Sequence, residues 1–195
     1  MGPPTVRATF LALAVGASMV RADEGNFARS SAFESVEAFV AAAGAFQPAT
    51  TRSDLSALFT VREPGFEGPK TGTLIAATSI QSSVALWSSD THAVVFVTAT
   101  PITDATRSAV GVLFLLNRTR KSWRIADSLR FTATGKEAEV SAELTAGTGS
   151  GYHLGSDSMK PIVTIKESQG GRGYAYQLSA SYTLSASKLE RLELK

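Results

Sequence analysis

The chain has 195 residues, of which 19 are Lys or Arg and 17 are Asp or Glu, and it contains no cysteine. This length is enough for one domain with a substantial core. The absence of cysteine excludes disulfides, thiol catalysis and thiolate metal sites, so stability must come from packing.

The first 22 residues have the composition of an export signal. Arg7 is the only charged residue before an apolar run at 8–20, and Val20 and Ala22 fit the two positions that a signal peptidase reads. The run is shorter than the roughly 20 residues that a transmembrane helix needs. We therefore expect a signal peptide over 1–22, export to a periplasm or out of the cell, and no membrane anchor after cleavage.

Removal of the signal changes the charge of the protein. Arg7 and Arg21 leave with it, so 17 of the 19 basic residues remain against 17 acidic ones. A neutral domain gives no general electrostatic reason to bind nucleic acid or an anionic membrane surface. The sequence therefore predicts a single globular domain over 23–195 that has no nucleic-acid partner.

Two segments near the start of this domain have the spacing of helix N-termini. Residues 31–34 have capping-box spacing and precede an apolar helical repeat, which predicts a helix over about 32–44. Residues 51–54 repeat the spacing and predict a short second helix. The helical part of the domain is thus expected at about 31–60.

Strand signals dominate the rest of the chain, about 73–195. A connection rich in Pro and Gly at 61–72 comes first, and turn residues then separate apolar runs rich in β-branched side chains. The expected strands are 73–80, 84–87, 93–99, 109–116, 122–132, 162–167, 173–184 and 189–194. Residues 137–146 could form a strand or a helix, and their alternation favours a strand.

The run from Ala109 to Leu116 is apolar on both of its alternating faces. A strand with one solvated face would not have this pattern, which predicts a central strand covered on both sides. The N-terminal helices can provide one cover. The other must come from a second sheet layer, a strongly curled sheet or a partner chain.

These elements predict an α+β fold, in which two N-terminal helices pack on a curved, mostly antiparallel sheet of about seven to nine strands. A β-sandwich or an open barrel with an N-terminal helix is the alternative. In layout alone, helices followed by a strand with Trp123, Arg124 and Ile125 resemble a nuclear-transport-factor-like α+β roll. The chain departs from that family by its additional C-terminal strands, and the resemblance implies no function.

Asp127 is the most anomalous residue of the expected strands. Strict alternation would place it on one face with four apolar side chains, Trp123, Ile125, Leu129 and Phe131. An unpaired carboxylate there would cost several kcal/mol. It could line a pocket as a general acid or base. A structural carboxylate that accepts backbone or Arg hydrogen bonds, or that a β-bulge turns outward, is the favoured interpretation.

The remaining motifs do not indicate a metal or a cofactor. His92 and His153 have no further ligands at metal-site spacing. The Gly-rich segments 147–151 and 170–173 depart from dinucleotide and P-loop spacing, so we expect them to be hairpin turns. We therefore expect neither a metal site nor a cofactor.

An aromatic stripe in the strand at 173–184 is the other candidate for binding. Tyr174, Tyr176 and Tyr182 share a face and could bind a sugar or peptide, and Arg172 in the preceding turn could meet an anionic ligand. Leu178 and other apolar residues extend the same stripe, which favours a strand that faces the core.

No catalytic constellation emerges from these residues. The sequence therefore predicts an exported, non-catalytic domain that binds a small ligand, a glycan or a protein. One alternative is a small hydrolase or isomerase that uses Asp127, aided by His92 or an Arg. Another is an assembly module, for which a homo-oligomer is open, with a second chain covering part of 109–116.

Overall fold

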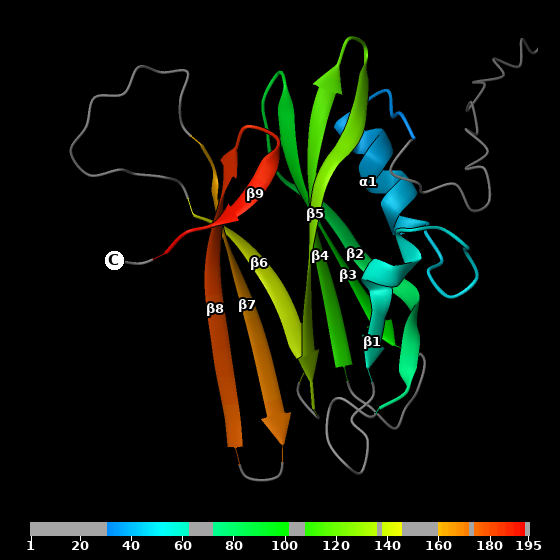
Figure 1. Ribbon diagram of the computed structural model, residues 1–195, viewed down its shortest axis with the longest axis vertical. Helices are drawn as coiled ribbons and strands as arrows, with labels where there is room; N and C mark the ends of the chain where they lie inside the picture. The colour runs from blue at the N-terminus through cyan, green and yellow to red at the C-terminus, as the bar shows by residue number, and fades with distance from the viewer. Residues whose placement is uncertain are drawn as a thin grey trace, which may run out of the picture.

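The computed structural model describes residues 31–62, 72–101, 108–135, 138–145, 160–171 and 174–193. Within them the chain is mostly antiparallel β-sheet, with one α-helix and one short 3-10 helix (Figure 1). The elements are α1 (Val36–Gly44), η1 (Ser56–Phe59), β1 (Thr60–Arg62), β2 (Leu74–Ser88), β3 (His92–Pro101), β4 (Ser108–Thr119), β5 (Ser122–Thr134), β6 (Glu139–Thr145), β7 (Ile162–Gly171), β8 (Tyr174–Ser185) and β9 (Lys188–Arg191).

The strands form two sheets in which each strand pairs with its neighbour along the chain. One sheet has the order β1-β2-β3-β4-β5 and the other β6-β7-β8-β9. The helix α1 packs on one face of the first sheet, and the second sheet curves over its other face in a nearly closed, barrel-like arrangement (Figure 1). Strand β6 lies against β2, β3, β4 and β5, so it crosses the first sheet at an angle.

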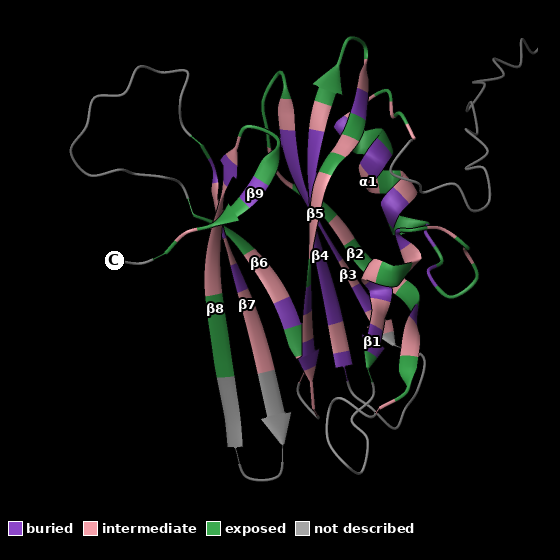
Figure 2. Cartoon of the chain, viewed as in Figure 1, coloured by how far each residue is buried: buried purple, intermediate pink, exposed green. Residues whose placement is uncertain are grey.

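Two hydrophobic cores lie on opposite faces of the first sheet. The first core joins α1 and η1 to that sheet, and the second core joins the two sheets. Strand β4 serves both, because Val112 and Phe114 lie in the first core and Leu113 and Leu115 in the second, all fully buried (Figure 2). The predicted double cover of this strand is confirmed. Both covers come from this chain, the second from the four-stranded sheet.

The predicted helices differ from those observed. Helix α1 begins at Val36, after Ser35, whose Oγ accepts a hydrogen bond from the backbone N–H of Ala38 at 3.1 Å. The predicted start near residue 32 is wrong because Phe33 pairs with Trp123 through two backbone hydrogen bonds, of 2.9 and 2.7 Å. The tertiary contact thus holds this segment extended and moves the cap to the next serine.

The second helix, predicted to be short, is not an α-helix. It is the single 3-10 turn η1, which ends where Thr60 takes an extended conformation and starts β1. Pairing with β2 from Thr60 onward replaces further helical turns. The predicted connection at 61–72 therefore begins with strand residues, and its residues 63–71 lie outside the described part.

The strands at 73–80 and 84–87 form one continuous strand, β2. Three register shifts against β3 interrupt its pairing, between Ala77 and Ser79, between Ile80 and Ser82 and between Ala85 and Trp87. Such bulges absorb the polar residues in the middle of the strand without ending it. The strand favoured at 137–146 is confirmed as β6.

One half-buried carboxylate in the second sheet gives a prediction for the pH dependence of stability. Burial raises the pKa of Glu167 on β7 above its ordinary value of 4.5. A raised pKa favours the protonated folded state, so stability from this group is present below pH 4.5 and is lost as the pH rises through the folded-state pKa. We expect Glu167→Gln to raise the free energy of unfolding at pH 7 by roughly 0.3 kcal/mol, small because solvent screens the partly exposed group.

Urea unfolding at pH 4 and pH 7 would check this, with no difference from the parent protein expected at pH 4. Glu143→Gln is the matched control, because the hydrogen bond from Lys166 and its charge lower the pKa of Glu143. This exchange should not stabilise the protein at pH 7. Equal effects of the two exchanges would contradict the assigned role of burial.

Candidate anion-binding site

The turn between β4 and β5 carries a dense group of positive charges. Thr119 pairs with Ser122, so Arg120 and Lys121 form a two-residue hairpin turn. Arg120 has a φ of 60°, in the left-handed region. A sequence selected only to make this turn would have Gly or Asn here, because a Cβ is disfavoured at positive φ. The backbone geometry of the turn therefore does not explain why an arginine is at position 120.

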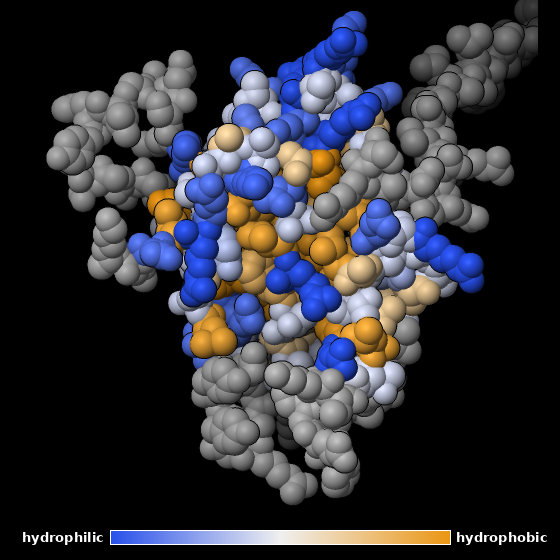
Figure 3. All heavy atoms as spheres, viewed as in Figure 1, coloured by the Kyte–Doolittle hydropathy of each residue, from blue (hydrophilic) through white to orange (hydrophobic). Residues whose placement is uncertain are grey.

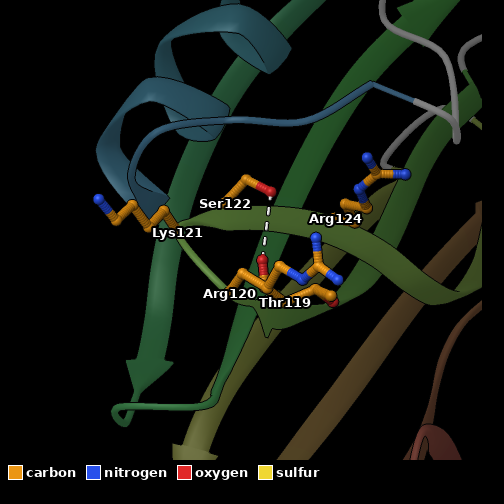
Figure 4. A pocket seen from close by; sticks show the side chains of 5 residues that line it. All are labelled: Thr119, Arg120, Lys121, Ser122 and Arg124. Carbon is orange, nitrogen blue, oxygen red and sulfur yellow. Dashed lines mark hydrogen bonds between the residues drawn. The ribbon is translucent and has the colours of Figure 1, made fainter.

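An open hollow of about 830 Å³ lies at this turn (Figure 4). It is lined by three cations and two hydroxyl residues, namely Arg120, Lys121, Arg124, Thr119 and Ser122. The side chains of Arg120 and Arg124 extend to one side of the hairpin, and that of Lys121 to the other (Figure 4). Hydrophilic side chains also gather over this end of the molecule (Figure 3). The hollow is thus lined by donors and positive charge.

Within the described ranges of the chain, no acidic side chain forms an ion pair with these cations. The one ion pair among the described residues joins Lys166 to Glu143 at 2.7 Å, away from the turn. Arg118, the fourth cation of the hairpin, has its guanidinium carbon 6.0 Å from the centroid of the Trp123 ring, at the outer limit of a cation–π contact. The other three cations are exposed and have no ion-pair partner in the part of the chain that the structure describes.

The base of the hairpin is rigidly held. Trp123 is 7 % exposed and belongs to the first core, and its backbone pairs with Phe33 ahead of α1. The turn therefore projects from a strand whose backbone is paired along both edges, by β4 and by Phe33, so the backbone of the turn needs little reorganisation to meet a ligand. Preorganisation of this kind reduces the entropy lost on binding.

The structure places Asp127 differently from the strict alternation. Leu115 pairs with Asp127 and Leu116 with Ile125, so Ala126 is the extra residue of a β-bulge. The bulge reverses the faces of β5, because residues before it pack in the first core and those after it in the second. The predicted shared face with Trp123 and Ile125 is therefore wrong.

The carboxylate of Asp127 makes two backbone hydrogen bonds. Its Oδ1 accepts from the N–H of Ser128 at 2.8 Å, and its Oδ2 accepts from the N–H of Leu189 at 2.9 Å. Leu189 is on β9, so the carboxylate links the two sheets. The backbone partners of the favoured interpretation are present, whereas the bulge does not turn Asp127 outward but places it, half-buried, on the face of the second core.

Of the two histidines singled out in the sequence, His92 is described, and it does not line the hollow. His92 begins β3, with Nδ1 at 2.8 Å from Thr91 Oγ1, and no hydrogen bond connects it to Asp127 in the described part of the chain. In the same part no three His, Cys, Asp or Glu side chains gather as metal ligands could. His153 and Arg172 lie outside the described residues.

The tyrosine stripe of β8 is only partly a core feature. Tyr174 and Tyr176 belong to β8, but their side chains are outside the described part. Tyr182 packs edge to face on Phe131 in the second core, with ring centroids 5.3 Å apart. Leu178 is 53 % exposed, so the stripe leaves the core along the strand.

From sequence alone, residues 117–121 are a basic turn that leads into a strand, and they are not singled out as a candidate site. The signal that could have found it is the segment Arg118–Arg124, which has four cations and no acidic residue. The neutral charge of residues 23–195 conceals this local excess.

Among the described helices, none has the length and apolar character needed to cross a membrane.

Comparison of the chain with protein-family models, with curated proteins and with solved structures gives no match.

Proposed function

We propose that this protein is an exported, non-catalytic binding domain whose basic hairpin, Arg118–Arg124, binds a small ligand with phosphate or carboxylate groups. The observation that carries the proposal is the hollow at the turn, lined by three cations that form no ion pair with any acidic residue that the structure describes. Like charges around one hollow repel each other, and a bound anion would relieve that repulsion. Arg120 and Arg124 can also bind an oxyanion through parallel N–H groups.

Export is supported by the apolar run at 8–20 and the small residue Ala22. In this proposal the mature protein is the single domain 23–195, and it acts outside the cytoplasm. N-terminal sequencing of the protein recovered from its own cells tests this part separately. A mature N-terminus at Asp23 is expected, and an intact Met1 in the recovered protein would refute it.

A non-catalytic role is supported by the engagement of Asp127. Both carboxylate oxygens accept backbone hydrogen bonds, so this group already has a structural task. The hollow itself is lined by cations and hydroxyls, without a carboxylate or histidine that could serve as a base. Ligand binding without turnover is the chemistry that this lining favours.

The sharpest test exchanges Arg120 for glycine. Because glycine accepts the positive φ without strain, Arg120→Gly should leave the free energy of unfolding unchanged or raise it by up to about 1 kcal/mol. The same exchange removes a cation from the hollow and should raise the Kd for pyrophosphate about tenfold. Calorimetric titration with inorganic pyrophosphate and thermal unfolding would measure the two effects on one variant.

The double variant Lys188→Ser with Arg191→Ser is the control, because both cations are exposed on β9 and neither lines the hollow. It should bind pyrophosphate as the parent protein does. Amide chemical-shift changes should centre on residues 118–124. If the control loses as much affinity for pyrophosphate as Arg120→Gly does, or if Arg120→Gly leaves the Kd unchanged, the anion binds only through the general surface charge and the proposed site is wrong.

A further inference from the structure

Among the described strands, none pairs with the outer edge of β2 beyond Ala76. Strand β1 pairs only with the first three residues of β2, Leu74 to Ala76. From Ala77 to Ser88 the pairing is with β3 alone, so in the described part of the chain the other side of this stretch has no strand neighbour. Unpaired N–H and C=O groups of such an edge are a template for another strand.

This edge lacks the charged residues that usually prevent such pairing. Strand β2 contains no Asp, Glu, Lys, Arg or Pro. The edge strands elsewhere are charged or very short: β5 carries Arg124, Asp127 and Arg130, β6 carries Glu139 and Glu143, β9 carries Lys188, Glu190 and Arg191, and β1 has three residues. Charges and short length are the devices by which proteins protect sheet edges. Strand β2 has only its bulges.

The bulges limit where a second strand could pair. Register shifts lie on both sides of the stretch from Ser82 to Ala85, and within it the register against β3 is continuous. Ser82, Val84 and Ala85 are exposed, with Val84 at 46 %. Ser83 is half-buried and faces Gly44 of α1. This four-residue stretch therefore combines regular extended backbone with three exposed side chains, and we call it the open edge.

We propose that two copies of this chain pair through the open edge, antiparallel and around a two-fold axis. In that arrangement each residue faces a residue of an identical strand, so a charged side chain near the two-fold axis would lie close to a charge of the same sign and repel it. The open edge has none, and its serine and valine side chains tolerate their own kind across a strand pair. A peptide of different sequence would require side-chain recognition that these small residues do not offer. Because the open edge carries no charge, a second copy of the chain is the favoured partner. The regular stretch is short, so we expect a dimer that dissociates on dilution.

The absence of cysteine from the chain makes this geometry directly testable. Single substitutions Ser79→Cys, Ser82→Cys, Val84→Cys and Ala85→Cys would each be oxidised and the covalent dimer quantified. A disulfide requires Cα atoms about 4.4–6.8 Å apart, which only positions near the two-fold axis satisfy. We expect one maximum within residues 82–85, a fall at Ser79→Cys, and no dimer for Leu178→Cys, an exposed position on β8. A flat profile across all positions would overturn the proposal.

A second measurement does not depend on cross-linking. Sedimentation of the native protein over a roughly hundredfold range of concentration should show a monomer–dimer equilibrium. Val84→Lys places two like charges across the dimer and should give a monomer with unchanged circular dichroism, whereas Leu178→Lys should still dimerise. A strict monomer for the parent protein, or a dimer unaffected by Val84→Lys, refutes the open edge as the interface.

Discussion

Replacing Gly111 with valine is expected to lower the free energy of unfolding by about 3 kcal/mol. Gly111 is on the central strand β4, at the point where the second sheet crosses it. A Cβ added there would lie 2.6 Å from Cζ of Phe96 and 2.6 Å from Cγ1 of Val140, closer than real Cβ contacts. Both neighbours are almost fully buried, so neither can swing into solvent. The backbone must therefore move, and the two sheets with it.

Chemical denaturation of Gly111→Val and Gly111→Ala would measure the loss, with about 2 kcal/mol expected for alanine. Gly44→Ala is the matched control, because a Cβ on Gly44 meets Ser83 at an ordinary 3.8 Å and alanine favours the helix. It should be neutral or slightly stabilising. Adding Val140→Ala to Gly111→Ala should recover part of the loss if the contact with Cγ1 is its cause. Simple additivity of the two exchanges would contradict the assigned clash.

Strand β4 could be predicted from the sequence, whereas the need for a glycine at position 111 could not. The apolar pattern at 109–116 is local, and it correctly predicts a strand covered on both faces. The need for Gly111 is not local, because it arises where Phe96 of β3 and Val140 of β6 converge on one point. Periodicity identifies which residues are buried, but not which atoms of distant strands meet them.

The bulge in β5 and the continuity of β2 could not be predicted from the sequence, for a different reason. Face assignments by alternation assume two residues per repeat, and one extra residue at Ala126 reverses every face that follows. Ile125, Ala126 and Asp127 carry no signal that marks a bulge. In β2 the polar residues at 81–83 suggested a break, whereas continued pairing with β3 keeps the strand intact. Tertiary pairing decided both outcomes.

The sequence shows the cations of the candidate site, but not whether they are neutralised by other residues. The four cations of Arg118–Arg124 lie within seven consecutive residues, so their number can be read directly from the sequence. Whether acidic residues from elsewhere neutralise them depends on the fold, and the ion pair found among the described residues is between β6 and β7. The positive φ of Arg120 is likewise a property of the folded turn. Asp127 stood out more in the sequence, yet its partner Leu189 lies far along the chain.

Asp127→Ala is expected to lower the free energy of unfolding by about 2 kcal/mol. The exchange removes the acceptor for the N–H groups of Ser128 and Leu189 and with it the side-chain link from β5 to β9. Asp127→Asn keeps one side-chain oxygen, so it should lose about half as much. Asp90→Ala, which removes an exposed carboxylate from the turn before β3, should have little effect.

Amide hydrogen exchange separates this structural role from a catalytic one. In Asp127→Ala the N–H of Leu189 should exchange at least about tenfold faster, while amides in the middle of β4 change only with global stability. A general acid or base would behave differently, because Asp127→Asn would then abolish turnover of a substrate without disturbing β9. An unchanged exchange rate at Leu189 in the alanine variant would mean that the carboxylate does not hold the two sheets together, and the catalytic alternative would regain its strongest residue.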